Sequence, residues 1–410
     1  MKAKNRFEDL AIAGAAPAFD EALSVGRPNI PGRETFLQRL EGILDSRTLT
    51  NNGPWLQEFE RKLAETLQVP HCVAVCNATV GLEIAARALG MEGEVILPSF
   101  TFIATAHALE WQRITPVFCD VDRRTHTIDP ARVEELIGPR TTGILGVHLW
   151  GRPCAVEALE EIAGRRGLHL MFDAAHALGS TYRGRRIGGF GEAEVFSFHA
   201  TKFVNAFEGG AIATRDAALA DRLRSMRSFG MAGHEEIQAV GTNGKMSEVS
   251  AAMGLTALEH LPELTAVNRR NYVAYQQALS GLAGLELIPF DGSEEYNYQY
   301  VVLEIDEEQG GLSRDRLVKV LQAENVLARR YFSPGCHQAE PYRSRDPHAA
   351  ARLPVTERLT HRTMALPTGT AVGPAEIDMI ARILRIALEN ARRVESDREP
   401  VRVAVSPAGH

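Results

Sequence analysis

The sequence predicts an α/β protein with a mostly parallel, doubly wound sheet and a smaller C-terminal α+β domain. Short β-rich runs alternate with helical patterns from about residue 70 to residue 215, as a doubly wound sheet requires. A long helical stretch then leads to a second unit with its own strand-like and helical runs. The 410 residues are enough for two domains and a sizeable buried core.

The strands of the predicted sheet are short, apolar and bounded by turn residues. They are residues 72–76, 94–98, 116–121, 143–149, 169–172, 194–198 and 210–214. The segments between them carry apolar residues at three- and four-residue spacing, which predicts helices with one buried face. These helices are residues 79–89, 101–111, 131–137 and 155–166. We therefore expect helices on both faces of the sheet.

The second unit follows a long helical stretch at residues 247–279, which is expected to break at Pro262 because the proline ring removes a hydrogen-bond donor. Residues 298–305 read as strand-like and residues 314–325 as a helix, and they are followed by a further run at residues 327–332. The final residues are charged and lack periodicity, which is typical of disorder. The expected division is an N-terminal arm at 1–30, a large cofactor-binding domain at 31–258, a small domain at 259–392 and a disordered tail at 393–410.

Composition argues against several classes of protein. The chain is 45% hydrophobic and 24% charged, and its apolar runs are too short to cross a bilayer, so no membrane span is expected. A net charge of −7 argues against nucleic-acid binding, which needs a basic face. Residues 10–19 are apolar, but Glu8 and Asp9 interrupt the positive flank of a secretory signal. The five cysteines include no Cys-x-x-Cys pair, which favours reduced thiols and a cytoplasmic protein.

Candidate phosphate donors follow two of the predicted strands. In open parallel sheets, ligands bind outside the carboxyl ends of the strands. Asn77, Ala78 and Thr79 open a helix whose free N–H groups can hold a phosphate, and Thr79 adds a hydroxyl. Ser197 is a second hydroxyl donor after a later strand. The structural alternative is that Asn77 is an ordinary helix N-cap.

Three further positions after strands suit a flat aromatic ligand. Phe102 can stack on a ring, although a phenylalanine more often fills a core. Asp173 can pair with a protonated pyridine nitrogen, or it can cap a helix. His176 can bind the ring's phenolic oxygen, or it can be a satisfied core histidine. A metal site is not expected, because no paired ligand spacing surrounds His176.

Lys202 completes this set, because it follows the apolar run at residues 196–198 and precedes Gly209 and Gly210. A desolvated lysine amine condenses with an aldehyde such as that of pyridoxal phosphate, whereas most lysines are simply solvated. The order of phosphate turn, stacking ring, aspartate and lysine on successive strands favours pyridoxal phosphate. A dinucleotide is disfavoured, since no Gly-x-Gly-x-x-Gly follows the first strand.

These residues resemble the DegT/DnrJ/EryC1/StrS family of pyridoxal-phosphate sugar aminotransferases, over about residues 25–390. The resemblance implies the type I fold of aspartate aminotransferase. Within the family, the chain is similar to enzymes that aminate dTDP-4-keto-6-deoxyglucose at C4 in the desosamine and other antibiotic sugar pathways. The strings that carry this finer likeness are residues 25–29, 148–154, 204–210 and 331–337.

The resemblance implies roles for the cofactor-binding residues. Lys202 would form the Schiff base, and Asp173 would contact the pyridine nitrogen. Phe102 would stack on the ring, and Asn243 would reach the phosphate from the partner subunit of a homodimer. Ala78, Thr79 and Ser197 would hold the phosphate within the same subunit.

Two residues depart from the family pattern: His176 stands where much of the family has glutamine, and Lys245 where an arginine is usual. The resemblance therefore says less about which side chains contact the ring oxygen and which line the rim of the site.

Candidate substrate contacts follow from the same resemblance and from charge. They are Trp150, Arg330, Tyr331 and His337. A guanidinium matches phosphate oxygens, so Arg330 can bind the diphosphate of a nucleotide sugar, or it can be a solvated rim residue.

The expected activity is transfer of the amine of L-glutamate to C4 of dTDP-4-keto-6-deoxy-D-glucose, giving dTDP-4-amino-4,6-dideoxy-D-glucose. The alternatives are a 3-keto sugar aminotransferase, a pyridoxal-phosphate sugar dehydratase of the same family, or a catalytically silent homologue that acts as a partner protein. The family's dehydratases have a histidine in place of the lysine, so Lys202 favours transamination.

Overall fold

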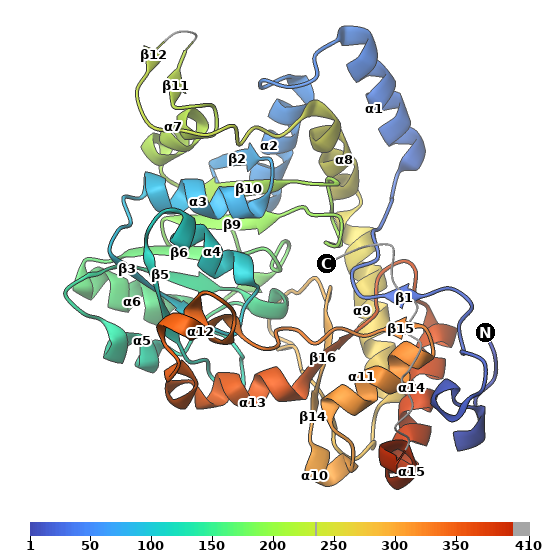
Figure 1. Ribbon diagram of the computed structural model, residues 1–410. Coiled ribbons are helices and arrows are strands. Elements are labelled where there is room, and N and C mark those ends of the chain that lie inside the picture. The colour runs from blue at the N-terminus through green and yellow to red at the C-terminus, as the bar shows by residue number, and fades with distance from the viewer. Residues whose placement is uncertain (234–235, 397–410) are drawn as a thin grey trace.

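The computed structural model describes residues 1–233 and 236–396 (Figure 1). A large unit surrounds a central sheet, and a smaller unit lies at its lower right in Figure 1. The helix α9 (Leu261–Ala278) leads from one unit to the other. Among the described residues, no helix is long and apolar enough to cross a membrane.

The central sheet has the strand order β2-β10-β9-β6-β5-β3-β4. The pairs β3·β4, β3·β5, β5·β6 and β6·β9 are parallel, whereas β10 is antiparallel to both of its neighbours. The mostly parallel sheet predicted from the sequence is therefore confirmed, and each predicted strand is present. The strands are β2 (His71–Val75), β3 (Glu94–Pro98), β4 (Thr115–Cys119), β5 (Thr141–Val147), β6 (His169–Asp173), β9 (Ala193–Ser197) and β10 (Gly210–Thr214).

Helices cover both faces of this sheet. One hydrophobic cluster holds buried residues of α2, α6 and α8, and a second holds residues of α3, α4 and α7. The helices around the sheet are α2 (Pro54–Leu67), α3 (Ala78–Ala88), α4 (Ile103–Trp111), α5 (Pro130–Leu136), α6 (Val156–Arg166), α7 (Ala217–Met226) and α8 (Glu248–Glu259). The long helical stretch breaks where expected, since α9 begins at Leu261 with Pro262 in its first turn.

The small unit has an antiparallel sheet of β13 (Leu285–Leu287), β14 (Val301–Ile305) and β16 (Thr363–Leu366). The helices α9, α11 (Arg314–Ala323) and α14 (Pro374–Glu389) pack on it in a separate hydrophobic cluster. The N-terminal segment joins this cluster through Phe7, Leu10 and Phe19. Its strand β1 (Leu23–Ser24) pairs in parallel with β15 (Val326–Leu327).

The remaining elements lie between or beyond these layers. They are α1 (Arg33–Ser46), α10 (Glu307–Gly310), α12 (Tyr342–Arg345), α13 (Pro354–Arg362), α15 (Ala391–Ser396), β7 (Thr181–Tyr182), β8 (Arg185–Arg186), β11 (Met231–Ala232) and β12 (Glu236–Ile237), with short 3₁₀ helices at Phe7–Asp9, Ala11–Ala13, Leu149–Gly151, Cys336–Gln338 and Ala349–Arg352. Residues 393–396, the first part of the tail that was expected to be disordered, belong to α15. The rest of that tail, residues 397–410, lies outside the described part of the chain.

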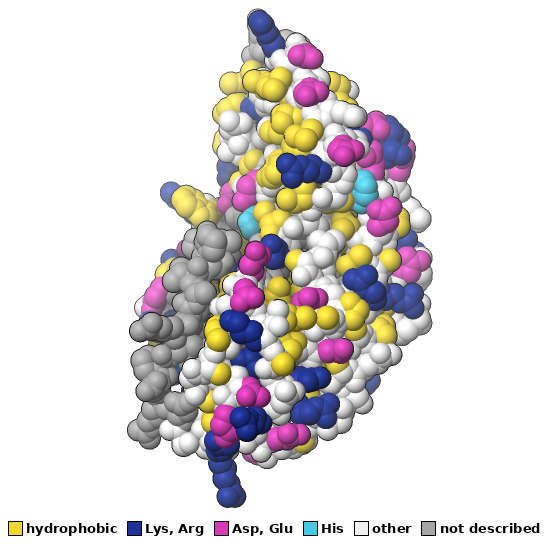
Figure 2. Space-filling view, turned by 90° about the vertical axis from the view of Figure 1, so that its right-hand side faces the viewer, with side chains coloured by type: hydrophobic (Ala, Val, Ile, Leu, Met, Phe, Trp, Pro, Cys, Tyr) yellow, Lys and Arg dark blue, Asp and Glu magenta, His cyan; other side chains and the backbone are white. Residues whose placement is uncertain are grey.

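The helix α1 packs little against its own chain. Ile43 is its one buried residue, whereas Leu37 and Leu44 are 45% and 60% exposed. Hydrophobic side chains gather in the upper part of the face in Figure 2, where Figure 1 places α1. A helix with an exposed apolar face is typical of a surface that another protein covers.

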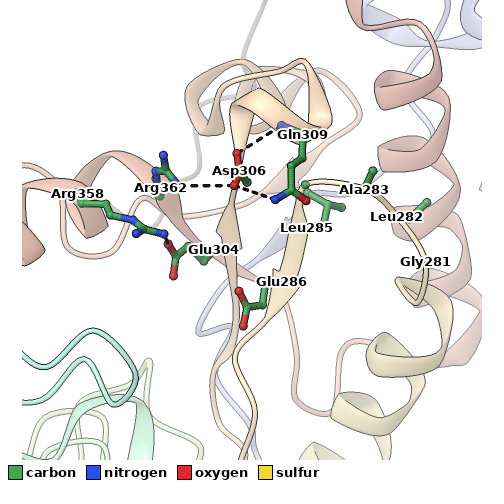
Figure 3. Close-up of a pocket in the computed structure, with 11 residues that line it drawn as sticks. Gly281, Leu282, Ala283, Leu285, Glu286, Glu304, Asp306, Gln309, Arg358 and Arg362 are labelled. Carbon is green, nitrogen blue, oxygen red and sulfur yellow. Dashed lines mark hydrogen bonds and ion pairs between the residues drawn. The ribbon is translucent and has the colours of Figure 1, made fainter.

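A cavity of about 300 Å³ lies at the small sheet (Figure 3). Arg358 pairs with Glu304 at 2.8 Å, and the guanidinium of Arg362 lies 3.9 Å from Asp306. Both arginines of the wall are therefore paired with carboxylates of the same wall. None of the predicted site residues lines this cavity.

Candidate active site

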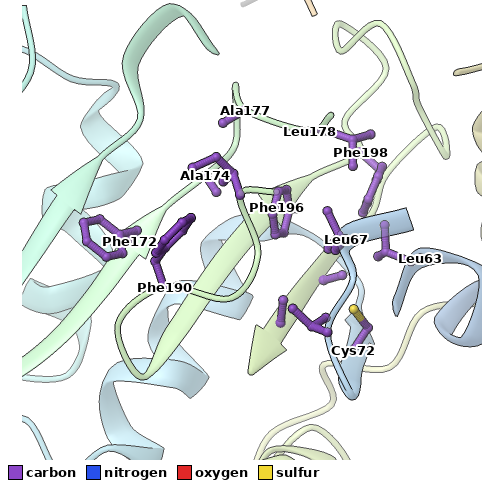
Figure 4. Close-up of a cluster of buried hydrophobic side chains, with 14 of the residues drawn as sticks. Leu63, Leu67, Cys72, Phe172, Ala174, Ala177, Leu178, Phe190, Phe196 and Phe198 are labelled. Atoms are coloured by element: carbon purple, nitrogen blue, oxygen red, sulfur yellow. The ribbon is translucent and has the colours of Figure 1, made fainter. Parts of the chain in front are cut away.

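The predicted site residues gather where the parallel strands end. Because β2, β3, β5, β6 and β9 run in one direction, their carboxyl ends meet at one edge of the sheet. Beneath this edge, Phe172, Phe196 and Phe198 are almost fully buried beside Leu63 and Leu67 (Figure 4). These side chains belong to one hydrophobic cluster, on which the strand ends that carry the polar residues are packed.

Lys202 lies in a turn after β9, where its backbone N–H donates to the carbonyl of His199 at 2.8 Å. Its half-buried side chain donates from Nζ to Tyr300 Oη at 3.3 Å. Burial lowers the pKa of this amine from 10.5 to about 8, although Tyr331 and Asp173 pull it upward. A substantial fraction of the amine is therefore neutral near pH 8, as a nucleophilic lysine requires.

Asp173 is the last residue of β6 and is 7% exposed. Its carboxylate accepts from Thr105 Oγ1 at 2.8 Å and from the backbone N–H of Ala175 at 3.1 Å. Burial raises the pKa of this carboxyl, whereas the two hydrogen bonds and Lys202 lower it. A cation beside the carboxylate, such as a protonated pyridine nitrogen, would favour its charged form further.

His176 is also 7% exposed, and its ring is sandwiched among aromatic side chains. It stacks on Trp150 and Phe332 with centroids 6.2 and 6.1 Å away, and Tyr300 Oη lies 3.1 Å from its Nε2. Burial, assisted by Lys202, lowers the pKa of His176 well below its ordinary value, so the ring is neutral. Its buried Nδ1 has no partner among the described residues.

The two predicted phosphate-binding segments meet at Gly210. This glycine is paired in register with Ser197, and a Cβ placed on it would lie 2.6 Å from the backbone nitrogen of Ala78. The absence of a side chain therefore lets β10 approach the N-terminus of α3, where Thr79 lies. Asn77 also acts as the N-cap, since its side chain accepts from the N–H of Val80. Asn77 can therefore cap α3 while the same helix N-terminus binds a phosphate.

An aromatic wall borders the site. Phe102 is 55% exposed and its ring centroid lies 6.4 Å from that of Phe332, so the alternative that it fills the core is wrong. Trp150 is 1% exposed and stacks on Phe332 at 5.2 Å, and Tyr331 stacks on the same ring at 4.9 Å. An exposed ring beside a buried aromatic cluster is suited to stacking on a ligand.

Three other predicted residues lie apart from this group or are already engaged. Asn243 is exposed in the segment before α8. Arg330 is 42% exposed and pairs with Asp315 at 2.8 Å. The two ring nitrogens of His337 contact Ser99 Oγ at 2.7 Å and Glu357 Oε1 at 2.6 Å, so this buried ring links β3 to α13. Their predicted roles in binding cofactor or substrate stay predictions.

Sequence reasoning missed Thr105 and Tyr300. Thr105 lies on α4, and its hydroxyl is 3.0 Å from that of Thr101. The two threonines are four residues apart in the sequence, and this spacing was a signal that they could lie on one side of a helix start. Tyr300 is 98 residues from Lys202 in the sequence and comes from the small unit. No local pattern connects two such positions.

Together these features fit pyridoxal phosphate. The N-terminus of α3 beside Gly210 suits the phosphate, and Asp173 suits the pyridine nitrogen. The unpartnered Nδ1 of His176 suits an oxygen acceptor on the ring, and Lys202 presents an amine of lowered pKa.

Comparisons with known proteins agree with this geometry. A family model described as the DegT/DnrJ/EryC1/StrS aminotransferase family matches residues 31–385. The dTDP-4-amino-4,6-dideoxy-D-glucose transaminase of Escherichia coli is 35% identical over 370 residues, which are 89% of this chain and 98% of that protein.

Solved structures are similar as well. A crystal structure of DesI in the presence of its TDP-sugar product is 51% identical, with a TM-score of 0.91, and the match covers 95% of this chain and 98% of that chain. The Helicobacter pylori aminotransferase PseC, involved in the biosynthesis of pseudoaminic acid, is 26% identical with a TM-score of 0.84. That match covers 90% of this chain and 100% of that chain.

Proposed function

The chain belongs to the DegT/DnrJ/EryC1/StrS aminotransferase family, and we propose that it transfers the amine of L-glutamate to C4 of dTDP-4-keto-6-deoxy-D-glucose. The product would be dTDP-4-amino-4,6-dideoxy-D-glucose. Membership confirms the predicted fold, the pyridoxal-phosphate cofactor and the sugar aminotransferase activity. The C4 position, the direction and the donor are the proposed part.

The observation that carries the proposal is the half-buried Lys202 amine, electrostatically coupled to Asp173 and held by Tyr300. When bound, the cofactor supplies the electron sink for breaking and making bonds at the carbon that bears the amine. Lys202 moves the proton at that carbon, since a positioned amine is an effective general acid and base. Asp173 holds positive charge at the pyridine nitrogen, and His176 offers a hydrogen-bond donor to the ring oxygen.

The substrate proposal is supported by the relatives. The Escherichia coli protein is named for a 4-amino-4,6-dideoxyglucose carried on dTDP, and the DesI structure holds its TDP-sugar product. Arg330 is a candidate for the diphosphate, with its charge at present shared with Asp315. Tyr331, in the aromatic wall, is the proposed sugar-side contact, whereas the predicted contact Trp150 is 1% exposed and supports the wall by stacking on Phe332.

We also propose a homodimer with shared active sites. The exposed apolar face of α1 supports a second copy of the chain as its cover (Figure 2). Phe36 of α1 packs edge-on against Phe207 at 5.6 Å, and Phe207 lies in the loop between Lys202 and Gly210. A partner on α1 would therefore be close to the cofactor, as the proposed role of Asn243 requires. Light scattering should give twice the chain mass, and Leu44→Glu should weaken the assembly.

The test of the activity uses purified protein with L-glutamate and either dTDP-4-keto-6-deoxyglucose or its 3-keto isomer. We expect an amine at C4, assigned together with its stereochemistry by NMR. Borohydride should fix the cofactor to Lys202, and Lys202→Ala should lose both the yellow colour and the transfer. Amination of the 3-keto isomer alone would contradict the proposed substrate, and labelling at another lysine would contradict the proposed site.

A further inference from the structure

Tyr300 comes from the small unit and contacts polar residues that follow strands of the large sheet. It immediately precedes β14 and is 9% exposed. Its ring packs against His176 at 4.5 Å and Trp150 at 5.6 Å between centroids. Its hydroxyl lies 3.3 Å from Lys202 Nζ and 3.1 Å from His176 Nε2. This one oxygen therefore connects Lys202 to His176.

Below about pH 8, where the Lys202 amine carries its charge, the chemistry of the three groups fixes the direction of the two hydrogen bonds. A lysine ammonium has three donors and no acceptor, so Lys202 donates to the Tyr300 oxygen. The phenol has one proton, which it then donates to His176 Nε2. Burial raises the pKa of Tyr300, so the phenol keeps that proton. The charged groups nearest to it are Lys202 and Asp173, and Tyr331 is the neighbouring phenol.

The consequence appears on the far side of the histidine ring. A neutral imidazole carries one proton, and if Nε2 accepts, that proton is on Nδ1. In the described structure Nδ1 is buried and has no partner. A buried donor without an acceptor is costly, so its retention points to a ligand atom that completes it.

We propose that Tyr300 is a positioning residue that holds the Lys202 amine and sets the tautomer of His176, leaving Nδ1–H as a donor toward the cofactor. The inference rests on the proposed function for its role in catalysis. It also explains how a histidine can serve at this position: the ring has a single proton to donate, and Tyr300 determines which nitrogen bears it.

The first test needs no substitution at Tyr300. With ¹⁵N-labelled histidine, NMR of the protein with and without cofactor reports the tautomer of His176, which is assigned by the signal lost in His176→Gln. At a pH below 8, where the Lys202 amine of the cofactor-free protein is charged, we expect the Nδ1–H tautomer in both states. Observation of the Nε2–H tautomer in wild type would overturn the inference, whether or not the enzyme aminates a sugar.

The second test is Tyr300→Phe, which keeps the packed ring and removes the hydroxyl. We expect the His176 signals to move toward the Nε2–H tautomer. We also expect kcat to fall about tenfold or more, since hydrogen bonds to charged groups are the stronger class, with little change in KM for the sugar. The lysine amine loses an acceptor for its charged form, so its titration should move to lower pH.

The matched control is Tyr272→Phe, which removes another buried phenol from the same unit. Tyr272 Oη donates to the carbonyl of Ile288 at 3.0 Å, away from the site. This variant should keep the wild-type His176 signals and kcat. If Tyr300→Phe behaves like Tyr272→Phe, the positioning role is wrong although the aminotransferase assignment stands. If wild type transfers no amine, the proposed function fails while the tautomer remains measurable.

Discussion

Thr105 shows how a single hydroxyl can support the charge of Asp173. The carboxylate is buried, and Thr105 Oγ1 is one of two donors that oppose the rise in its pKa. In Thr105→Val the pKa of Asp173 should rise further, so the charged form is lost at a higher pH. We expect kcat/KM to fall about tenfold to a hundredfold, because hydrogen bonds to charged groups contribute ~1.5–3 kcal/mol. The acid limb of the pH profile should move upward.

The control for this prediction is Thr101→Val. Thr101 Oγ1 contacts the Thr105 hydroxyl at 3.0 Å, so it is one hydrogen bond further from the Asp173 carboxylate. Thr101→Val should therefore shift the acid limb of the pH profile much less than Thr105→Val does. An unchanged limb in Thr105→Val would show that the threonine contributes packing alone.

Lys202 makes a prediction about pH. Its pKa falls from 10.5 to about 8 on folding because burial disfavours the ammonium. The amine is charged below about pH 8 and neutral above it, and only the neutral form attacks an aldehyde. Cofactor uptake by the apoprotein, followed by visible absorbance, should therefore rise with pH with a midpoint near pH 8. A midpoint near 10.5 would mean that the amine is solvated.

At the scale of secondary-structure elements, the prediction concerns Gly210, where β10 approaches the start of α3. A Cβ at this position would lie 2.6 Å from the backbone of both Asn77 and Ala78, so Gly210→Ala must push β10 away from the start of α3. Overpacking of this kind costs about 1–3 kcal/mol. We expect cofactor affinity, measured by absorbance titration, to fall about tenfold.

The matched control is Gly164→Ala, in the interior of α6 with open space around the added Cβ. There alanine should stabilise the helix by about 0.5–1 kcal/mol and leave cofactor affinity unchanged. Equal effects of the two substitutions on affinity would argue against a phosphate site at Gly210.

The elements also show which parts of the fold were predictable. Local hydrophobic patterns located the strands of the large sheet to within a few residues, because burial on both faces leaves continuous apolar runs. The antiparallel insertion of β10 between β2 and β9 was not predicted, because strand order depends on contacts between distant segments. The helices α1, α2, α7, α13 and α14 were also missed.

The same distinction applies at the site. Lys202, Asp173 and His176 each follow a strand of one sheet, so the topology that was predicted brings them together. Tyr300 comes from another unit, and its part in the site depends on how the two units pack. The placement of Trp150 at the buried centre of the aromatic wall depends likewise on Phe332 from the small unit.

At the scale of the whole molecule, the N-terminal segment is joined to the small unit by a buried ion pair. Lys4 and Glu324 are 1% and 0% exposed and lie 3.0 Å apart. Glu324 also accepts from the backbone N–H groups of Ala11 and Ala18. The first residues of the chain are therefore bound to the end of α11, next to β15, which pairs with β1.

Lys4→Met should release this N-terminal segment, because it leaves the Glu324 carboxylate buried without its cation. Breaking one side of a buried pair costs about 3–5 kcal/mol, whereas an exposed pair contributes about 0–1 kcal/mol. Lys2→Met is the matched control, since Lys2 pairs with Asp20 at 3.3 Å with both side chains largely exposed. Hydrogen exchange should accelerate across residues 5–19 in Lys4→Met, with a lower Tm, and stay as in wild type in Lys2→Met. Equal exchange in the two variants would mean that the apolar contacts of Leu10 and Phe19, rather than the buried charge pair, hold the N-terminal segment on the small unit.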